Sequence, residues 1–440
     1  MKRIATLITI ILISLQHLLA QNPICPPGVY IADPSAKVFN GTLYLYGSTD
    51  ESCEHWCSWH HDVISTSDML HWEFTNKVMH SKGVNDEVPY SDNLLFAPDC
   101  AFANDSFYLY YCQPEKDFAE GVAVSHNPTG PFTNGTAINT YGNSQIDPSC
   151  FIDDDGTAYY IWGQFSLKMA KLKPNMREID ETTLQKDLIT EKEHFFHEGA
   201  FMTKRNGLYY LVYADISRED KPTCLGYATS SSPFGPYQYG GVIVDNEGCN
   251  PNNWNNHGSI AEFKGQWYVF YHRSTHACGV MRKACVEKIE FNTDGSIPEV
   301  PMTSQGAADP FIATKEIDAA RACLLQGDLF IQAENEKNEI LTHIKNDDKG
   351  IFKFINFGAG VKSATIRVRA IKGGTINLTA DKPWQLHLGK VNVEPTSNPS
   401  EWKEVTFDVN QQISGVHALW MQMWGDGENL MEIDWIRFNN

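Results

Sequence analysis

One ionisable residue recurs at the same place in five similar sequence phrases, and this register constrains the fold more than any other feature of the chain. The five residues are Asp33, Asp99, Asp147, Glu198 and His257. A turn follows each at a similar distance, and an aromatic-rich run follows the turn, as in VFNGTLYLYG from Val38 and EFKGQWYVFYHR from Glu262. A chain that repeats one supersecondary unit in this way predicts a repeat architecture, in which each unit brings one polar side chain to an equivalent position.

Short β-strands are predicted throughout residues 21–310. Alternating runs of Tyr, Val, Ile, Phe and Trp are broken by Gly, Asn-Gly and Asp-Gly turns, and no long helical periodicity is visible. A second phrase also recurs, as SHNPTGPF from Ser125 and SSSPFGPY from Ser230. Four-stranded units repeated about an axis form a β-propeller, so five units predict an all-β, five-bladed propeller. One or two β-sandwiches are the alternative, but sandwiches seldom place an ionisable residue at one register in consecutive units.

The two ends of the chain differ from this repeating region. In residues 1–20, Lys2 and Arg3 precede an apolar run, and the small residue Ala20 at its end is typical of a signal-peptide cleavage site. This pattern predicts a secretory signal peptide and an exported protein, periplasmic or extracellular, with an uncleaved anchor as the alternative. Residues 311–327 have a helical composition and are predicted to bridge two domains. Residues 328–440 alternate strands with polar turns, which predicts a jelly-roll-like β-sandwich.

Length and charge limit the number of domains and the kinds of partner. A chain of 440 residues favours two domains. The net charge of −19 argues against a nucleic-acid partner, because phosphate binding needs a basic face. Beyond the N-terminus no stretch is long and apolar enough to span a bilayer, and we expect a monomer. The 11 cysteines permit disulfides in an exported chain, and their odd number leaves at least one thiol free.

The five recurring residues suit glycosidic-bond cleavage if they face one pocket. The innermost strand of each propeller blade lines the central channel, so a residue at one end of each such strand points into a shared funnel. Glycoside hydrolysis needs one protonated carboxyl that donates to the leaving oxygen and one ionised carboxylate that activates water or attacks carbon. Each residue alone also has a structural explanation: the Asp33-Pro34 pair can start a turn, and His257 can be a satisfied core histidine. Their common register favours catalysis.

The motifs that carry these residues resemble those of glycoside hydrolase family 43. They read IADPSAKVFNG, FAPDCAF, QIDPSCFIDDDG, FFHEGAF and NNHGSIAEF, and the resemblance covers about residues 28–305. It implies a five-bladed propeller and hydrolysis with inversion of the anomeric centre. By motif it implies that Asp33 is the general base, Glu198 the general acid, and Asp147 a third carboxylate that orients the acid and tunes its proton affinity. His257 would lie near a metal ion in the channel, often calcium, although no cofactor is required for the chemistry.

Further residues are expected to contact the substrate. Phe96 stands where members of the family often have Trp, so it is a candidate wall of the sugar subsite, and Asp99 is expected to bind or orient. Trp162, His257 and Arg282 are further candidates, although a tryptophan in the place of Trp162 is more often a core residue and Arg282 can be a solvated strand residue. The segment CEHWCSWHHD from Cys53 lacks the spacing of a zinc site and is expected to form a loop over the pocket rim.

The C-terminal domain resembles carbohydrate-binding module family 6, on the phrases IQAENE near its start and EIDWIRF at its end. The resemblance implies a structural calcium ion held by Glu334, Glu336 and Asp434. It also implies aromatic residues on loops that bind sugar. A degenerate domain that is purely structural is the alternative.

Together these features predict an exported, inverting glycoside hydrolase. Its expected action is the release of terminal α-L-arabinofuranose or β-xylose from plant-type polysaccharides or oligosaccharides. Another sugar, such as galactofuranose, is the alternative substrate. A non-catalytic propeller that only binds sugar is the alternative from another class. A sialidase-type propeller is disfavoured, because the repeated Ser-x-Asp-x-Gly-x-Thr-Trp boxes of that class are absent.

Overall fold

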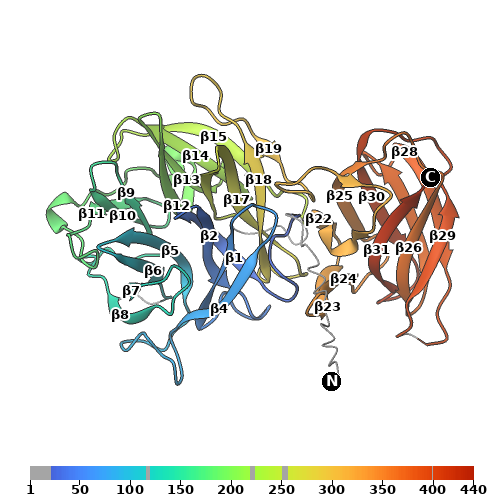
Figure 1. Cartoon of the computed structure of the whole chain (residues 1–440), viewed down its shortest axis with the longest axis horizontal. Coiled ribbons are helices and arrows are strands. Elements are labelled where there is room, and N and C mark those ends of the chain that lie inside the picture. The colour runs from blue at the N-terminus through green and yellow to red at the C-terminus, as the bar shows by residue number, and fades with distance from the viewer. Residues whose placement is uncertain (1–20, 115–118, 219–222, 250–255, 399) are drawn as a thin grey trace, which may run out of the picture.

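The computed structural model describes residues 21–114, 119–218, 223–249, 256–398 and 400–440, and the predicted signal peptide lies outside these ranges. The chain forms two lobes (Figure 1). The first lobe holds five sheets, antiparallel apart from the β15–β19 pair, and the second holds two larger sheets, so the predicted all-β fold, a five-bladed propeller followed by a sandwich, is confirmed. No helix in the described ranges is long and apolar enough to cross a membrane.

The five sheets are the propeller blades, each ordered from the channel outwards. Blade 1 contains β1 (Ile31–Phe39), β2 (Thr42–Thr49), β3 (His60–Thr66) and β4 (Glu73–His80). Blade 2 contains β5 (Phe96–Ala103), β6 (Ser106–Cys112), β7 (Glu120–Ser125) and β8 (Thr133–Ala137). Blade 3 contains β9 (Ser149–Ile152), β10 (Ala158–Trp162) and β11 (Lys168–Lys171), followed by the 3-10 turn η1 (Glu181–Thr183) and the short helix α1 (Glu191–His194). Blade 4 contains β12 (Phe196–Arg205), β13 (Leu208–Asp215), β14 (Cys224–Ser230), β15 (Gln238–Asp245) and β19 (Val300–Pro301). Blade 5 contains β16 (Ser259–Phe263), β17 (Gln266–Ser274) and β18 (Arg282–Ile289).

The innermost strands form a closed circle. Strand β1 packs beside β5, β5 beside β9, β9 beside β12, β12 beside β16, and β16 beside β1. Most residues of the inner and second strands are buried, and aromatic and aliphatic side chains form the core between blades, including Tyr46, Leu109, Tyr160 and Val212. The repeated aromatic phrases of the sequence are thus the walls between neighbouring blades.

Three of the inner strands are irregular where their recurring polar residue lies. The pairing register shifts between Ala32 and Ser35 in β1, between Phe96 and Asp99 in β5, and on both sides of Glu198 in β12. A β-bulge bends a strand and redirects a side chain. Asp33 and Asp147 also have positive φ angles of 52° and 60°, a conformation that aspartate tolerates better than most residues. The local backbone therefore turns these carboxyl groups away from the regular alternation of the strands.

Two contacts close the ring between the first and last blades. The N–H of Ile24 donates to the carbonyl of Ala284 at 2.9 Å, so the N-terminal segment runs along β18, where a fourth strand of blade 5 would lie. A disulfide joins Cys53, in the β2–β3 loop, to Cys278, in the β17–β18 loop. The disulfide spans 225 positions of sequence. A cross-link of that span lowers the conformational entropy of the unfolded chain and thereby stabilises the fold by up to about 5 kcal/mol. The other nine cysteines are buried.

The predicted helical bridge over residues 311–327 is wrong. This segment contains the short strands β20 (Phe311–Ile312), β21 (Ile317–Asp318) and β22 (Leu324–Gln326), with only the 3-10 turn η2 (Ala319–Arg321) between them. All three strands pair with the C-terminal sheets. Phe311, Ile317 and the neighbouring alanines are buried in the core of that domain, so tertiary packing overrides the helical propensity of the segment.

The second lobe is a sandwich of two six-stranded sheets around one core. The first sheet contains β20, β22, β25 (Lys349–Asn356), β27 (Gly374–Ala380), β28 (Leu386–Val393) and β30 (Val416–Trp424). The second contains β21, β23 (Phe330–Asn335), β24 (Asn338–Thr342), β26 (Ser363–Ala370), β29 (Lys403–Asp408) and β31 (Met431–Asn439). Inward-facing aliphatic side chains from both sheets, such as Ile366, Leu378 and Ile433, make the core.

The two lobes are joined by specific, buried contacts. Lys283 of β18 forms a buried ion pair with Glu339 of β24. The Arg273 guanidinium donates to the carbonyl of Ala322 at 2.7 Å, and the N–H of Ile331 donates to the carbonyl of Thr275 at 2.9 Å. The sandwich is therefore attached through main-chain and charged contacts and not through a simple linker.

The buried ion pair at this junction gives a first prediction. Replacing Glu339 by Ala leaves the Lys283 ammonium buried without its carboxylate, so we expect the free energy of unfolding to fall by about 3–5 kcal/mol. Glu334→Ala is the matched control, because Glu334 pairs with Arg369 on the exposed side of the same domain and should cost no more than about 1 kcal/mol. Chemical denaturation monitored by circular dichroism measures both. Equal losses in the two variants would contradict the assignment of a structural role to the junction pair.

Candidate active site

Three of the five recurring residues meet at the mouth of the channel, and a fourth lies against them. The Nδ1 atom of His257 is 3.7 Å from Asp33 Oδ1 and 3.7 Å from Asp147 Oδ2. Glu198 is followed by Gly199, whose φ is +70° and where an added Cβ would come within 2.7 Å of the His257 ring. Only glycine permits that close approach, so the Glu-Gly pair is what allows the acidic residue of blade 4 to pack against the histidine of blade 5.

Asp33 is held in its ionised form. Burial alone would raise the pKa of Asp33, but the adjacent Arg282 guanidinium, aided by His257, His272 and the Ser48 hydroxyl, brings this pKa well below its usual range. Arg282 NH1 donates to Asp33 Oδ1 at 2.9 Å, and Ser48 Oγ donates to Asp33 Oδ2 at 2.6 Å. Asp33 is therefore a carboxylate at neutral and mildly acidic pH.

The pKa of Asp147 is shifted in the opposite direction. Burial, together with the neighbouring carboxyl groups of Glu198 and Asp33, raises the pKa of Asp147 well above its usual range. Its Oδ2 atom is buried and accepts no hydrogen bond from the described residues. The site thus combines one carboxyl group that favours ionisation with another that favours its neutral form, which is the arrangement that acid–base chemistry requires.

Glu198 is held from blade 3. The Nε2 atom of Gln164, in the loop after β10, donates to Glu198 Oε2 at 2.8 Å. His197 Nε2 lies 3.9 Å from the same oxygen, which is longer than a hydrogen bond. Glu198 itself is 4% exposed, so it reaches the channel mouth without being open to bulk water.

Two predicted substrate contacts are corrected by their burial. Asp99 is 1% exposed, and both of its oxygens are occupied, by the Ser35 hydroxyl, the Lys37 ammonium and the N–H of Cys150. It joins blades 1, 2 and 3 below the mouth. Trp162 is fully buried in the core between blades, where its indole N–H donates to the carbonyl of Asn143 at 2.8 Å. Neither residue can touch a ligand in the mouth.

Phe96 and the segment around Cys53 lie near the mouth, as the sequence predicts. Phe96 is half-buried and precedes Ala97, whose N–H donates to Ser48 Oγ at 2.7 Å. Within the Cys53 loop, the Trp56 ring stacks on the Arg282 guanidinium at 4.7 Å. The zinc alternative for this segment is not supported, because Cys53 is consumed by the disulfide. Sugar contacts by Phe96 stay a prediction.

The sequence did not point to four residues that support the site: Ser48, Asp50, His272 and Gln164. Asp50 accepts two hydrogen bonds from the Arg282 side chain, from Nε and NH2, each at 2.9 Å. The N–H of Asp33 donates to His272 Nδ1 at 3.0 Å. These residues lie at the ends of the second strand of each blade or just after it, so the only available signal was a polar residue ending an otherwise apolar strand.

The predicted calcium ligands of the sandwich do not fit a metal ion. Arg369 donates to both oxygens of Glu334 at 3.1 Å, and Arg367 donates to Asp434 Oδ2 at 2.8 Å. Glu336 is exposed in the turn between β23 and β24. Guanidinium groups therefore occupy the positions where a cation would bind. Within the described ranges no three His, Cys, Asp or Glu side chains form a metal-binding group.

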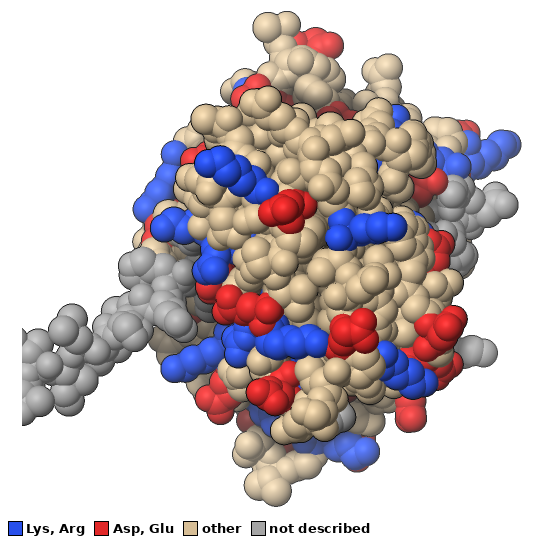
Figure 2. Space-filling model, turned by 90° about the vertical axis from the view of Figure 1, so that its right-hand side faces the viewer, with Lys and Arg blue, Asp and Glu red and all other residues tan. Residues whose placement is uncertain are grey.

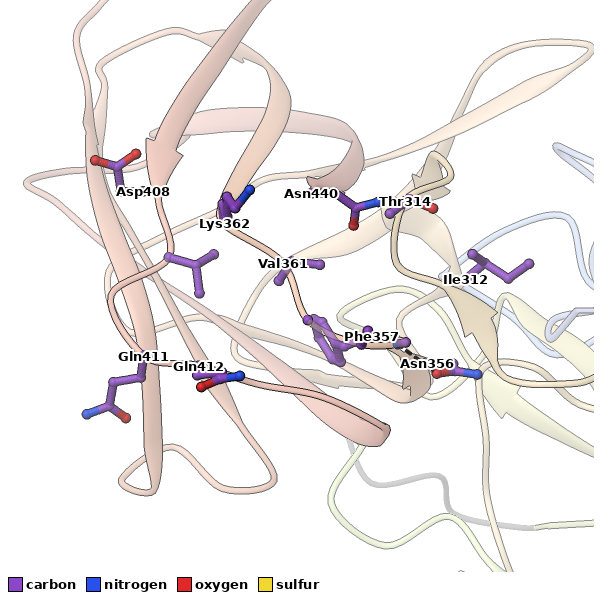
Figure 3. A pocket seen from close by; sticks show the side chains of 14 residues that line it. Ile312, Thr314, Asn356, Phe357, Val361, Lys362, Asp408, Gln411, Gln412 and Asn440 are labelled. Atoms are coloured by element: carbon purple, nitrogen blue, oxygen red, sulfur yellow. Dashed lines mark hydrogen bonds between the residues drawn. The ribbon is translucent and has the colours of Figure 1, made fainter.

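A large cleft of the described structure lies away from these carboxyl groups. A cleft of ≈ 960 Å³ opens in the sandwich between the β25–β26 loop, the β29–β30 loop and the C-terminus. Figure 3 shows Lys362 and Asp408 on one side of it and Ile312 on the other. The only aromatic side chain there, Phe357, is buried, so the cleft has no exposed ring for a sugar. On this end of the molecule acidic and basic side chains are interspersed (Figure 2), and the surface selects neither sign of ligand charge.

Comparisons with known proteins agree with the geometry. The family model for glycosyl hydrolases family 43 matches residues 20–297, and the model for carbohydrate binding module (family 6) matches residues 326–440. A xylosidase/arabinosidase of Thermoclostridium stercorarium is 28% identical, over 92% of this chain and 96% of its own. An arabinoxylan arabinofuranohydrolase of Bacillus subtilis (strain 168) is 28% identical, over 92% of this chain and 90% of its own.

Solved structures show the same likeness. A family 43 arabinoxylan arabinofuranohydrolase from Bacillus subtilis, crystallised in complex with cellotetraose, has a TM-score of 0.54 and 26% identity, with 96% of this chain and 99% of that chain covered. The protein therefore belongs to glycosyl hydrolases family 43, and its C-terminal domain matches carbohydrate binding module family 6.

Proposed function

We propose that this glycosyl hydrolase releases terminal pentose residues, α-L-arabinofuranose or β-xylose, with inversion of the anomeric centre. The observation that carries the proposal is the pairing of opposite protonation preferences at one channel mouth. Arg282 lowers the pKa of Asp33, while burial and neighbouring carboxyl groups raise the pKa of Asp147. Membership of a hydrolase family argues against the alternative of a propeller that only binds sugar.

In the proposed mechanism Asp33 is the general base. Its carboxylate takes a proton from a water molecule as the water oxygen attacks the anomeric carbon. Glu198 is the general acid, and its proton passes to the glycosidic oxygen as the bond from that oxygen to the anomeric carbon breaks. Asp147, beside both groups, orients the acid. His257, held between Asp33 and Asp147, fixes their separation.

The substrate class follows from the relatives and not from the pocket. Relatives that cover nearly the whole chain are named for xylosidase/arabinosidase and arabinoxylan arabinofuranohydrolase activities. A β-D-galactofuranosidase of Aspergillus niger is also 27% identical over 65% of this chain, which keeps galactofuranose as the second candidate. A panel of nitrophenyl pentosides and a nitrophenyl β-D-galactofuranoside separates the two.

Export of the enzyme is part of the proposal. The basic and apolar N-terminal segment supports it, and so does the disulfide between Cys53 and Cys278, because such bonds persist in oxidising compartments. Polysaccharide too large to cross a membrane is then the natural source of the substrate.

The catalytic pair can be tested by isosteric substitution. Asp33→Asn and Glu198→Gln should each reduce kcat on an unactivated pentoside by roughly 10²–10⁴-fold, because each removes one proton-transfer group without changing volume. The exposed pair Asp155→Asn and Glu193→Gln is the control and should leave activity unchanged. NMR of the first product formed by the wild type should show the inverted anomer. A retained anomer, or near-normal activity in either catalytic variant, would reject the mechanism.

The role of Arg282 gives a prediction about pH. In the wild type the lowered pKa of Asp33 keeps the base ionised, and activity is lost only when the pH falls through that low value. Arg282→Met removes the main lowering charge, so the pKa of Asp33 rises and the acidic limb of the kcat/KM profile should move to higher pH. Arg282→Lys retains a cation without the planar fork and should shift the limb less. An unchanged limb in Arg282→Met would show that another group governs it.

A further inference from the structure

A chain of hydrogen bonds crosses three blades and ends on the carboxyl group of Glu198. Gln164 Nε2 donates to Glu198 Oε2 at 2.8 Å. The backbone N–H of Gln164 donates in turn to Gln145 Oε1 at 2.8 Å, and Lys168 Nζ donates to the same oxygen at 2.6 Å. The N–H of Gln145 donates to Glu120 Oε1 at 2.6 Å. The chain therefore starts at Glu120 in blade 2, passes through blade 3 and reaches Glu198 in blade 4.

The residues of this chain have little freedom to move. Glu120 is fully buried, and burial raises its pKa to about 7. The turn that carries Gln164 is tight: Gly163 has a φ of +137°, and an added Cβ there would come within 2.4 Å of the Ser166 carbonyl. On the far side of the turn, the N–H of Phe165 donates to the carbonyl of His197 at 2.7 Å, which ties it to the start of β12. The amide of Gln164 is thus fixed from both sides relative to Glu198.

An amide donor fixes how a carboxylic acid carries its proton. In a protonated carboxyl group the carbonyl oxygen is the better acceptor and the hydroxyl oxygen is the donor. A donor aimed at Oε2 therefore favours placing the proton on Oε1. Since only a proton on the oxygen that faces the glycosidic bond can be transferred to it, the donor selects the productive arrangement before the reaction begins.

We propose that Gln164 is a positioning residue that holds Glu198 as a proton donor through Oε1. The inference rests on the proposed function, in which Glu198 is the general acid. In the step concerned, the proton leaves Oε1 for the glycosidic oxygen, the electron pair of the broken bond stays on that oxygen, and Glu198 is left as a carboxylate. Gln164 then stabilises the negative charge through the same N–H group.

Leaving-group dependence tests this role. An aryl pentoside with a good leaving group, such as 2,4-dinitrophenolate, needs little protonation, whereas a phenyl pentoside needs the acid. Gln164→Met preserves the length of the side chain but removes the donor, so we expect kcat on the phenyl pentoside to fall roughly 10- to 100-fold. On the dinitrophenyl pentoside the fall should be less than about threefold, because the acid contributes little there. Gln185→Ala, an exposed glutamine at the edge of the same blade, is the control and should change neither rate.

A second variant tests the donor itself. Gln164→Glu has nearly the same shape, but it can donate only while its new carboxyl group is protonated. Its phenyl pentosidase activity should therefore approach that of the wild type at low pH and fall with rising pH, ahead of the wild-type basic limb. The charged or titratable groups that face Glu198 are Asp147 before β9, His197 on β12 and His257 before β16, and all three are unchanged in this variant.

The outcomes separate the inference from the function on which it rests. Glu198→Gln, measured on the same two substrates, must itself show the larger loss on the phenyl pentoside, and without that result the assignment of the acid fails. If Glu198→Gln shows it and Gln164→Met loses both activities equally, Gln164 has only a structural or binding role and the inference is overturned. A rise in KM with unchanged kcat in Gln164→Met would overturn it in the same way.

Discussion

The buried guanidinium of Arg282 is the interaction on which the mouth of the channel depends. It comes from blade 5, and both carboxylates that it binds, Asp33 and Asp50, come from blade 1. Leaving any one of these three groups buried and unpaired would cost several kcal/mol. The seam of the ring therefore cannot open without a large electrostatic penalty. The same contact that joins blade 5 to blade 1 also lowers the pKa of Asp33, so one interaction both closes the ring and favours the ionised form of this carboxyl group.

Asp33 and Asp147 show how similar positions in a repeat acquire different chemistry. Both begin an Asp-Pro-Ser motif, both have positive φ angles and both are buried. They differ in their neighbours, because Asp33 has a guanidinium and a hydroxyl whereas Asp147 has carboxyl groups. Burial raises the pKa of each, and for Asp33 the Arg282 cation, aided by His257, His272 and the Ser48 hydroxyl, reverses the effect. The repeat gives the two carboxyl groups equivalent positions, and their neighbours, several of which come from the second strand of a blade or the loop after it, determine their pKa values.

This division also marks how far the sequence could be interpreted. The five-fold register predicted the propeller, its inner strands and the meeting of Asp33, Asp147 and His257, because one shared register places these residues at the same end of the inner strands. It could not predict that Lys37 and Ser35 occupy Asp99, since that contact crosses blades and leaves no local pattern. The predictions of a substrate contact at Trp162 and of a helical bridge over residues 311–327 were wrong for a related reason. Burial between blades in the first case, and pairing with distant strands in the second, outweighed local composition. Gln164 could not be singled out as a site residue from the sequence, because a glutamine in a loop has no ionisable side chain, although its amide donates directly to Glu198.

Strand β18 connects the chemistry of the ring to the sandwich. Successive side chains of a β-strand point to opposite faces, so Arg282 and Lys283 are directed to opposite sides of this strand. Arg282 meets the carboxylates of the channel mouth, while Lys283 meets Glu339 of the sandwich and lies under the ring of Tyr30. The residue that binds the two carboxylates of blade 1 is thus next in sequence to the residue that anchors the sandwich, and β18 is the element that links the two.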